Sequence, residues 1–345
     1  MWLCVFMGVP MAAIVGVFGH SIEVSLGGDG AVLHAATTYL RISAFGIPAV
    51  LIALVGHGHM RGLSDTRTPL RVVLVANVVN VVLEVVLVYG FDTGIAGSAW
   101  GTVVAQWLAG AWFIAMSGRR ILATGTTLRP RPAEIKRLLV IGRHLAVRTG
   151  ALVLTITGAT SVAARVGTST LGAHQIALQV ELFLALAVDA LAIAAQAMIG
   201  TLLGAGDVEE VRATSRRLVT MGWLVGGALA VVVAASAPLL PHVFSGDGSV
   251  TSRATVALVV VGIMQVPGGI AFVTDGILMG ASDFRFLQWA IVAAGLTFAP
   301  FAVLVLHWHS LGILGVWSGL FVWMTVRAIL NGVRVRNERW MLVAR

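Results

Sequence analysis

Long apolar segments recur along almost the whole chain, and this pattern limits what the chain can fold into. Windows of about 20 or more apolar residues are typical of helices that span a membrane. Such windows lie at residues 3–25, 35–60, 69–90, 95–117, 134–158, 170–202, 211–240, 253–280, 286–306 and 312–334. The sequence therefore predicts an all-α, polytopic membrane protein with ten transmembrane helices in these 345 residues.

Composition excludes a soluble enzyme. The chain is 58% hydrophobic and only 11% charged, whereas soluble domains carry about 25% charged residues. No soluble fold of this size has enough interior to bury so much apolar surface. The sequence also contains no nucleotide-binding glycine loop, nucleophile elbow or cluster of metal ligands. We therefore expect no catalytic residues, no bound metal and no cofactor, and a lipid bilayer as the main partner.

The basic residues indicate an orientation in the membrane rather than nucleic-acid binding. The net charge is +8, but the basic residues are spread over short segments between the predicted spans. One side of the membrane receives 19 of the 23: Arg61, Arg67, Arg71, the seven from Arg119 to Arg143, Arg212, Arg216, Arg217, Arg285, Arg327, Arg334, Arg336, Arg339 and Arg345. The positive-inside rule makes this side, and with it the C-terminus, cytoplasmic.

An internal repeat divides the chain into two lobes. At an offset of 218 residues, three turn segments match: 28–30 with 246–248, 61–67 with 279–285, and 94–97 with 312–315. Because the two halves face the same way, we expect a parallel repeat with its axis along the membrane normal. The predicted organisation is a four-helix lobe at 1–117, a cytoplasmic linker at 118–133, and a six-helix lobe at 134–345 with a basic tail.

The unequal lobes predict that two helices precede Met1 in the complete protein. If the second half begins near residue 133, the offset places the matching start of the first half before the chain begins. We therefore expect ten helices of a twelve-helix protein. The alternative is a genuine ten-helix variant.

Glu84 is the foremost candidate for chemistry inside the membrane. An ionisable side chain within a span costs about 2.5–3.5 kcal/mol on insertion scales, so it is a functional candidate by default. Asn80 lies one helical turn before Glu84 on the same face, and Asn77 lies near the next turn. An amide oxygen beside a carboxylate can bind Na⁺ or hold a protonated acid. The alternative is an inter-helix hydrogen bond that serves packing alone.

The second lobe contains further ionisable residues within its predicted spans. Arg148 lies in the fifth span, and Glu181 and Asp189 lie two turns apart in the next. A buried arginine needs a partner, so we expect Arg148 to pair with one of these two acids, either as a structural ion pair or in gating. Asp275 lies near the end of its span, where a helix-terminal or loop-facing structural role is expected.

Ordered motifs along the chain resemble those of the MATE (multidrug and toxic compound extrusion) transporters. In the first lobe they are the segment 60–69, Asn80 with Glu84, and Gly97-Ser98-Ala99-Trp100-Gly101-Thr102. In the second lobe, Arg148-Thr149, Gly172-Ala173-His174-Gln175-Ile176, the segment 189–196 and the segment 275–280 resemble the DinF-like (DNA-damage-inducible protein F) subgroup.

This resemblance implies two six-helix lobes, alternating access, and export of small organic or cationic compounds driven by H⁺ or Na⁺. It assigns cation coupling to Asn80, Glu84 and Thr102, although the family usually has Asp where this chain has Glu84. We further expect a monomer in the bacterial cytoplasmic membrane. Two alternatives remain: a lipid-linked oligosaccharide flippase with the same architecture, and a fragment that does not transport.

Overall fold

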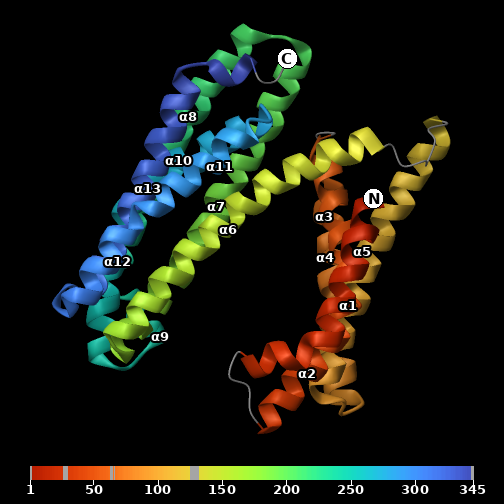
Figure 1. Ribbon diagram of the computed structural model, residues 1–345, viewed down its shortest axis with the longest axis horizontal. Helices are drawn as coiled ribbons and strands as arrows, with labels where there is room; N and C mark the ends of the chain where they lie inside the picture. The colour runs from red at the N-terminus through yellow and green to blue at the C-terminus, as the bar shows by residue number, and fades with distance from the viewer. Residues whose placement is uncertain (1, 26–29, 63–64, 66, 125–131, 343–345) are drawn as a thin grey trace. The chain divides into compact units, whose positions relative to one another are not determined.

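The computed structural model describes residues 2–25, 30–62, 65, 67–124 and 132–342, and nearly all of them are helical (Figure 1). The chain divides into two compact units, residues 1–136 (unit 1) and 137–345 (unit 2), and each is described by itself. The predicted linker is shorter than expected, because α5 continues to Thr124 and α6 begins at Pro132. The linker residues between them lie outside the described residues.

Unit 1 is a bundle built around one helix. Its elements are α1 (Trp2–Ser25), α2 (Gly30–Ala44), α3 (Ile47–Gly62), α4 (Arg67–Glu84), η1 (Val85–Gly90) and α5 (Gly94–Thr124). The long helix α5 packs against α2, α3 and α4, while α1 packs against α2 and α3. A hydrophobic cluster joins α3, α4 and α5 and includes Met60 on α3, Val72 on α4 and Phe113 on α5.

The predicted span 35–60 is a bent pair of helices. The axes of α2 and α3 differ by 52° at the break between Ala44 and Ile47. Pro48 follows this break directly. Proline has no backbone N–H and clashes with the preceding turn, so it fits well in the first turn of a helix and weakens or kinks a helix in its interior. The break therefore falls where proline can begin a new helix.

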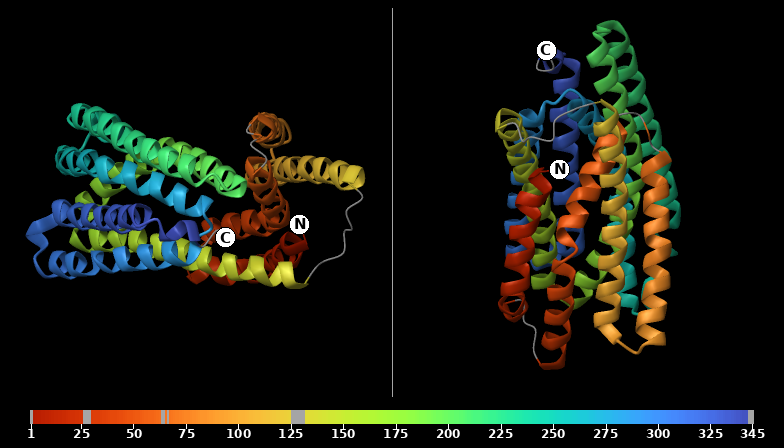
Figure 2. Two further views of the ribbon diagram at one scale, coloured as in Figure 1. Left: turned by 90° about the horizontal axis from the view of Figure 1, so that it is seen from above. Right: turned by 90° about the vertical axis from the view of Figure 1, so that its right-hand side faces the viewer.

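Unit 2 is organised around α10. Its elements are α6 (Pro132–Val166), α7 (Thr168–Ala205), α8 (Val208–Ser236), α9 (Leu240–Phe244), α10 (Gly248–Gly280), α11 (Phe284–Leu296), α12 (Phe298–His307), η2 (His309–Leu311), α13 (Gly312–Arg336) and η3 (Arg339–Leu342). Helix α10 packs against α7, α8 and α13, and the helices of this unit run alongside one another (Figure 2). Among the candidate spans, α10 has the largest buried share, 56% of its apolar window.

The predicted number of spans is confirmed. Nine of the described helices are long and apolar enough to cross a membrane, and the bent α2–α3 pair makes ten. The prediction at 286–306 corresponds to α11 and α12, which are separated by Thr297. The Thr297 hydroxyl donates to the Ala294 carbonyl at 2.6 Å, so this side chain satisfies a backbone acceptor at the helix end.

The internal repeat is visible in the packing of each unit. In unit 1, α5 packs against α4 and against the α2–α3 pair, which also packs on α1. In unit 2, α13 packs against α11 and α12 and against α10, which also packs on α8. Helices matched by the offset of 218 residues thus have matching neighbours.

Candidate functional site

Helices α4 and α5 approach each other closely at two small residues. Gly97 and Gly101 lie four residues apart on α5 and therefore share one face. A Cβ atom at Gly101 would lie 3.4 Å from the Glu84 backbone nitrogen, and one at Gly97 would lie 3.0 Å from the Leu87 Cβ. Small residues at this spacing allow helix backbones to pack closely in a membrane. Gly101 therefore makes ordinary van der Waals contact with the end of α4, and Gly97 packs more tightly against η1.

Two hydrogen bonds cross this interface, one turn apart. Ser98 donates its hydroxyl to the Glu84 carboxylate at 2.8 Å, and Asn80 donates its side-chain amide to the Thr102 hydroxyl at 3.3 Å. Thr102 in turn donates to the Ser98 carbonyl at 3.0 Å. Two residues four apart on α4 thus meet two residues four apart on the antiparallel helix α5. These four side chains, Asn80, Glu84, Ser98 and Thr102, are called the α4–α5 cluster below.

The backbone changes where Glu84 ends α4. The next element, η1, is a π-helix of six residues, a form that is rare and frequently found at functional sites. A hollow of about 480 Å³ opens beside it, lined by Val81, Glu84, Val85, Val88, Tyr89, Gly94, Ile95 and Ser98. Its lining combines one carboxylate with mostly apolar side chains. Such a site can accept a small cation or the charged end of an amphipathic molecule.

Asn77 does not take part in the α4–α5 cluster. Its side chain is exposed and donates to the Val73 carbonyl of its own helix at 2.9 Å. The structure therefore joins three of the four predicted residues, Asn80, Glu84 and Thr102, and adds Ser98. The signal for Ser98 is present in the sequence, because it stands one turn before Thr102, just as Glu84 stands one turn after Asn80.

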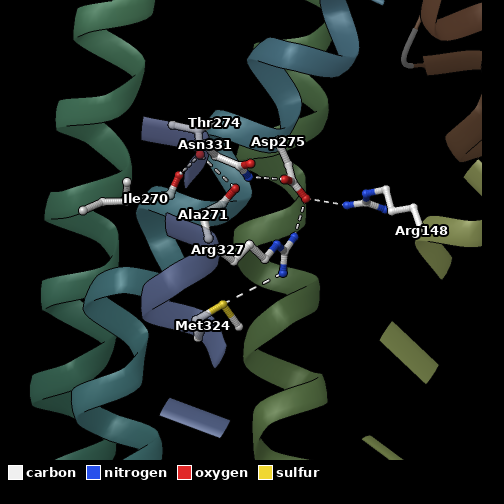
Figure 3. A network of polar contacts seen from close by, with 8 residues as sticks. All are labelled: Arg148, Ile270, Ala271, Thr274, Asp275, Met324, Arg327 and Asn331. Atoms are coloured by element: carbon white, nitrogen blue, oxygen red, sulfur yellow. Dashed lines mark hydrogen bonds and ion pairs between the residues drawn. The ribbon is translucent and has the colours of Figure 1, made fainter. Parts of the chain in front are cut away.

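A second polar cluster lies inside unit 2, centred on Asp275 of α10 (Figure 3). Its carboxylate accepts hydrogen bonds from Arg148 of α6, Arg327 of α13 and Asn331 of α13. Both arginines also form ion pairs with it. Asp275, Arg327 and Asn331 are only 4, 2 and 0% exposed. These four residues, called the Asp275 cluster below, link three helices.

Three expectations about this cluster are wrong. Arg148 pairs with Asp275 rather than with Glu181 or Asp189, and Asp275 faces the interior of unit 2 rather than a loop. Arg327, which we counted with the cytoplasmic residues, is buried within α13. The reason is the same in each case: a buried carboxylate needs compensating charge, and α13 presents Arg327 and Asn331 one turn apart on one face towards α10.

The other two predicted acids have different surroundings. Glu181 accepts a hydrogen bond from the Gln265 amide of α10 at 2.6 Å. Asp189 is exposed on α7. The structure thus separates Glu181 and Asp189 from the arginine with which we had grouped them. In the sequence, Gln265 gave no signal of its own beyond being a polar residue in an apolar span.

The two clusters differ in what they can do chemically. The Asp275 carboxylate already has two guanidinium groups and an amide around it, so its charge is fully compensated within the protein. Glu84 has a neutral hydroxyl donor and borders a hollow. In the described part of the chain no group of three or more metal-ligating side chains occurs. Glu84 is therefore the carboxylate better placed to gain and lose a cation.

Comparison with known proteins places this chain among transporters. The MatE family model matches residues 1–86 and 153–304. "Protein DETOXIFICATION 44, chloroplastic" of Arabidopsis thaliana is 31% identical over 96% of this chain and 66% of its own length. "DNA damage-inducible protein F" of Escherichia coli is 27% identical over 88% of this chain and 66% of its own length. "Probable multidrug resistance protein NorM" of Rhodopseudomonas palustris is 29% identical, with coverage of 96 and 72%.

Solved structures show the same fold. A MATE protein in the bent conformation matches with a TM-score of 0.88 at 19% identity, over 99% of this chain and 77% of that one. The Vibrio cholerae MATE transporter VcmN in the bent form matches with a TM-score of 0.84 at 20% identity, over 97% of this chain and 78% of that one. The chain spans 54–66% of the length of four Arabidopsis relatives. It belongs to the MatE family, the MATE transporters, which are not enzymes.

Proposed function

We propose that the protein exports small organic or cationic compounds across the cytoplasmic membrane in exchange for H⁺ or Na⁺, by alternating access of two lobes. The observation that carries this proposal is the half-buried carboxylate of Glu84 within a membrane span, hydrogen-bonded to Ser98 beside an open hollow. The relatives of this chain include a probable multidrug resistance protein, which supports small organic or cationic compounds as the substrates. The basic-rich segments are proposed to face the cytoplasm.

The α4–α5 cluster offers a physical route to coupling. An ionised carboxylate is costly inside a membrane, and a bound H⁺ or Na⁺ removes much of that cost. The Asn80 amide donates to Thr102, which leaves the amide oxygen on the same helix face as the Glu84 carboxylate. Occupancy by a cation would thus change the electrostatic cost of placing this hairpin in lipid. At a membrane potential of 100 mV, the entry of one charge supplies about 2.3 kcal/mol.

The arginines favour this proposal over a flippase for a lipid-linked oligosaccharide. A flippase of that kind would be expected to line a groove inside the membrane, away from the helix ends, with arginines that are available to phosphate groups. Arg148 and Arg327 are instead engaged by Asp275. Arg41 is exposed on α2, and one such residue does not form an arginine-lined groove.

The test replaces Glu84 by glutamine, which keeps the size of the side chain and its ability to accept a hydrogen bond from Ser98. Proteoliposomes with the purified protein are loaded with ethidium, and efflux is driven by an imposed pH gradient or by a Na⁺ gradient. We expect Glu84→Gln to slow driven efflux at least tenfold, and Glu84→Asp to retain it because the family usually has Asp there. Glu134→Gln, an exposed acid at the start of α6, is the control.

Driven efflux by Glu84→Gln at the wild-type rate would refute the role of this carboxylate. The intact mass of the protein from its native host decides which form enters the assay. A mass about 9–10 kDa above 36.1 kDa fits two further spans and their loops. If the 36.1 kDa chain is the native form and shows no ion-dependent efflux, the non-transporting alternative takes precedence.

A further inference from the structure

A recess opens in unit 2 at the end where α8 begins and α13 ends, near the C-terminus marked in Figure 1. Its volume is about 460 Å³. Its lining includes Arg212, Ser215 and Arg216 of α8, Arg336 of α13, and Glu338 and Trp340 after α13. None of its lining residues belongs to either cluster described above, and the proposed transport mechanism does not use them.

Positive charge is in excess around the recess. Arg212 binds Glu338 through Nε and Nη2, at 3.0 and 2.7 Å. Within the part of the chain that the structure describes, Arg216 and Arg336 have no carboxylate partner. Arg212 is paired with Glu338 and also lies near a second acid, Glu209, so the positive charge of the recess comes from the guanidinium groups of Arg216 and Arg336.

A buried hydroxyl adds an independent sign of a missing ligand. Ser215 is only 5% exposed, and its Oγ has no hydrogen-bond partner among the described residues. Buried polar atoms nearly always have a partner, so an exception at the wall of a cavity calls for an occupant. Ser215 lines the recess, and its hydroxyl still has one hydrogen bond to donate.

The floor of the recess is apolar and firmly held. After α13 the chain turns at Glu338, which has φ +55°, and the short helix η3 brings Trp340 and Met341 back towards α8. The indole of Trp340 donates to the Val335 carbonyl at 2.9 Å. Trp340 is fully buried in a cluster with Val211 and Leu218 of α8. The site is therefore formed by the fold itself and combines cationic walls with an apolar base.

We propose that this recess binds the phosphate group of an anionic phospholipid. Arginine forks and a hydroxyl donor are the groups that recognise phosphate oxygens. Basic pockets between transmembrane helices on the cytoplasmic side bind anionic lipid headgroups, and anionic lipids are concentrated there. The apolar base suits the part of the lipid next to its headgroup. Free inorganic phosphate shares the same chemistry, and the experiment separates the two sources.

The experiment measures lipid binding to the purified chain in detergent by native mass spectrometry. Phosphatidylglycerol and phosphatidylcholine are titrated in parallel, with and without millimolar inorganic phosphate. We expect preferential retention of phosphatidylglycerol. Replacing the two arginines that lack a carboxylate partner, Arg216→Ala with Arg336→Ala, should weaken its binding by about 30-fold, given the usual contribution of each arginine near an anionic lipid. The matched control is Arg137→Ala with Arg143→Ala, two exposed arginines of α6 on the same basic-rich side.

Competition with inorganic phosphate shows which part of the phospholipid the recess recognises. Displacement of phosphatidylglycerol by phosphate shows that the phosphate group alone is recognised, and no displacement shows that the lipid is required. Ser215→Ala, which leaves every charge in place, should weaken binding while the melting temperature stays unchanged. The proposal is overturned if phosphatidylglycerol binds no better than phosphatidylcholine, or if the control pair and the recess pair weaken it equally.

Discussion

The hairpins α4–α5 in unit 1 and α11/α12–α13 in unit 2 occupy matching places in the repeat, but the interface between the helices is polar in unit 1 and apolar in unit 2. Both are packed closely by glycines four residues apart, Gly97 and Gly101 in one and Gly315 and Gly319 in the other. At the offset of 218 residues, the residues that match Asn80, Glu84, Ser98 and Thr102 are Phe298, Ala302, Val316 and Leu320. Both copies of the repeat thus have the glycine pair, but only the copy in unit 1 has hydrogen-bonding side chains across the interface.

At the interface between α10 and α13, and at its counterpart between α3 and α5, the charged residues are in unit 2 instead. In unit 2, α10 and α13 are joined by Asp275, Arg327 and Asn331. The same offset leads to His57, Ala109 and Phe113 in unit 1, where the rings of His57 and Phe113 meet edge to face with centroids 4.8 Å apart. Each unit thus places its carboxylate at a different helix pair. The acid of unit 2 is ion-paired with two arginines, whereas the acid of unit 1 borders a hollow and is the one that we propose exchanges a cation.

The largest expected effect is at Asp275. Asp275→Asn removes the charge that compensates the buried Arg327 and the partly buried Arg148, and breaking a buried pair on one side costs about 3–5 kcal/mol of unfolding free energy. Unit 2 should therefore melt well below the wild-type temperature, measured by circular dichroism in detergent. Asp189→Asn, the same change at an exposed position of α7, should leave the melting temperature unchanged.

An apolar replacement sharpens this test. Because uncompensated charge is the cause, Asp275→Leu combined with Arg327→Met should recover much of the lost stability. Arg148, whose side chain is 18% exposed, can then find other partners. If the single variant Asp275→Asn melts like the wild type, the cluster does not hold the three helices together.

The next effect separates two glycines that match in the repeat, Gly319 in unit 2 and Gly101 in unit 1. A Cβ at Gly319 would lie 2.7 Å from the Phe301 Cβ and 2.9 Å from the Phe298 ring, which leaves no room for a methyl group. Gly319→Ala should therefore cost about 1–3 kcal/mol through overpacking. A Cβ at Gly101 meets only contacts of 3.4 Å or more. Gly101→Ala should be neutral or slightly stabilising, since alanine favours helix over glycine by up to about 1 kcal/mol. Equal melting temperatures for the two variants would show that the interfaces are equally tight.

Features that depend on a single helix or on the internal repeat could be predicted from the sequence. The spans follow from apolar length, and the face shared by Asn80 and Glu84 follows from their spacing of four. Thr102 came from the family resemblance rather than from spacing. What the sequence could not supply was the rotation of one helix against another. The partner of Arg148 depends on which face of α10 meets α6, and no local pattern records that.

Arg327 shows the same limit in another form. An arginine near a helix end normally extends its charged group to the membrane surface, so its position in the sequence favoured the cytoplasm. The signal that points the other way is Asn331, one turn later on the same face, within a predicted span. A polar pair at a spacing of four marks an inward face, but its acid lies 52 residues away on α10.

The smallest expected effect tests the hydrogen bond that distinguishes the α4–α5 cluster from its apolar counterpart. Ser98→Ala removes the donor to Glu84, a loss of about 0.5–1.5 kcal/mol for a hydrogen bond of this kind. The melting temperature should fall slightly, and its dependence on Na⁺ or on pH should change because Glu84 has lost the group that orients it. Ser161→Ala is the control, since that exposed hydroxyl donates to Thr157 of its own helix. If Ser98→Ala keeps the wild-type response to Na⁺ and pH while Glu84→Gln abolishes it, Glu84 acts without Ser98 and the polar character of this interface serves packing alone.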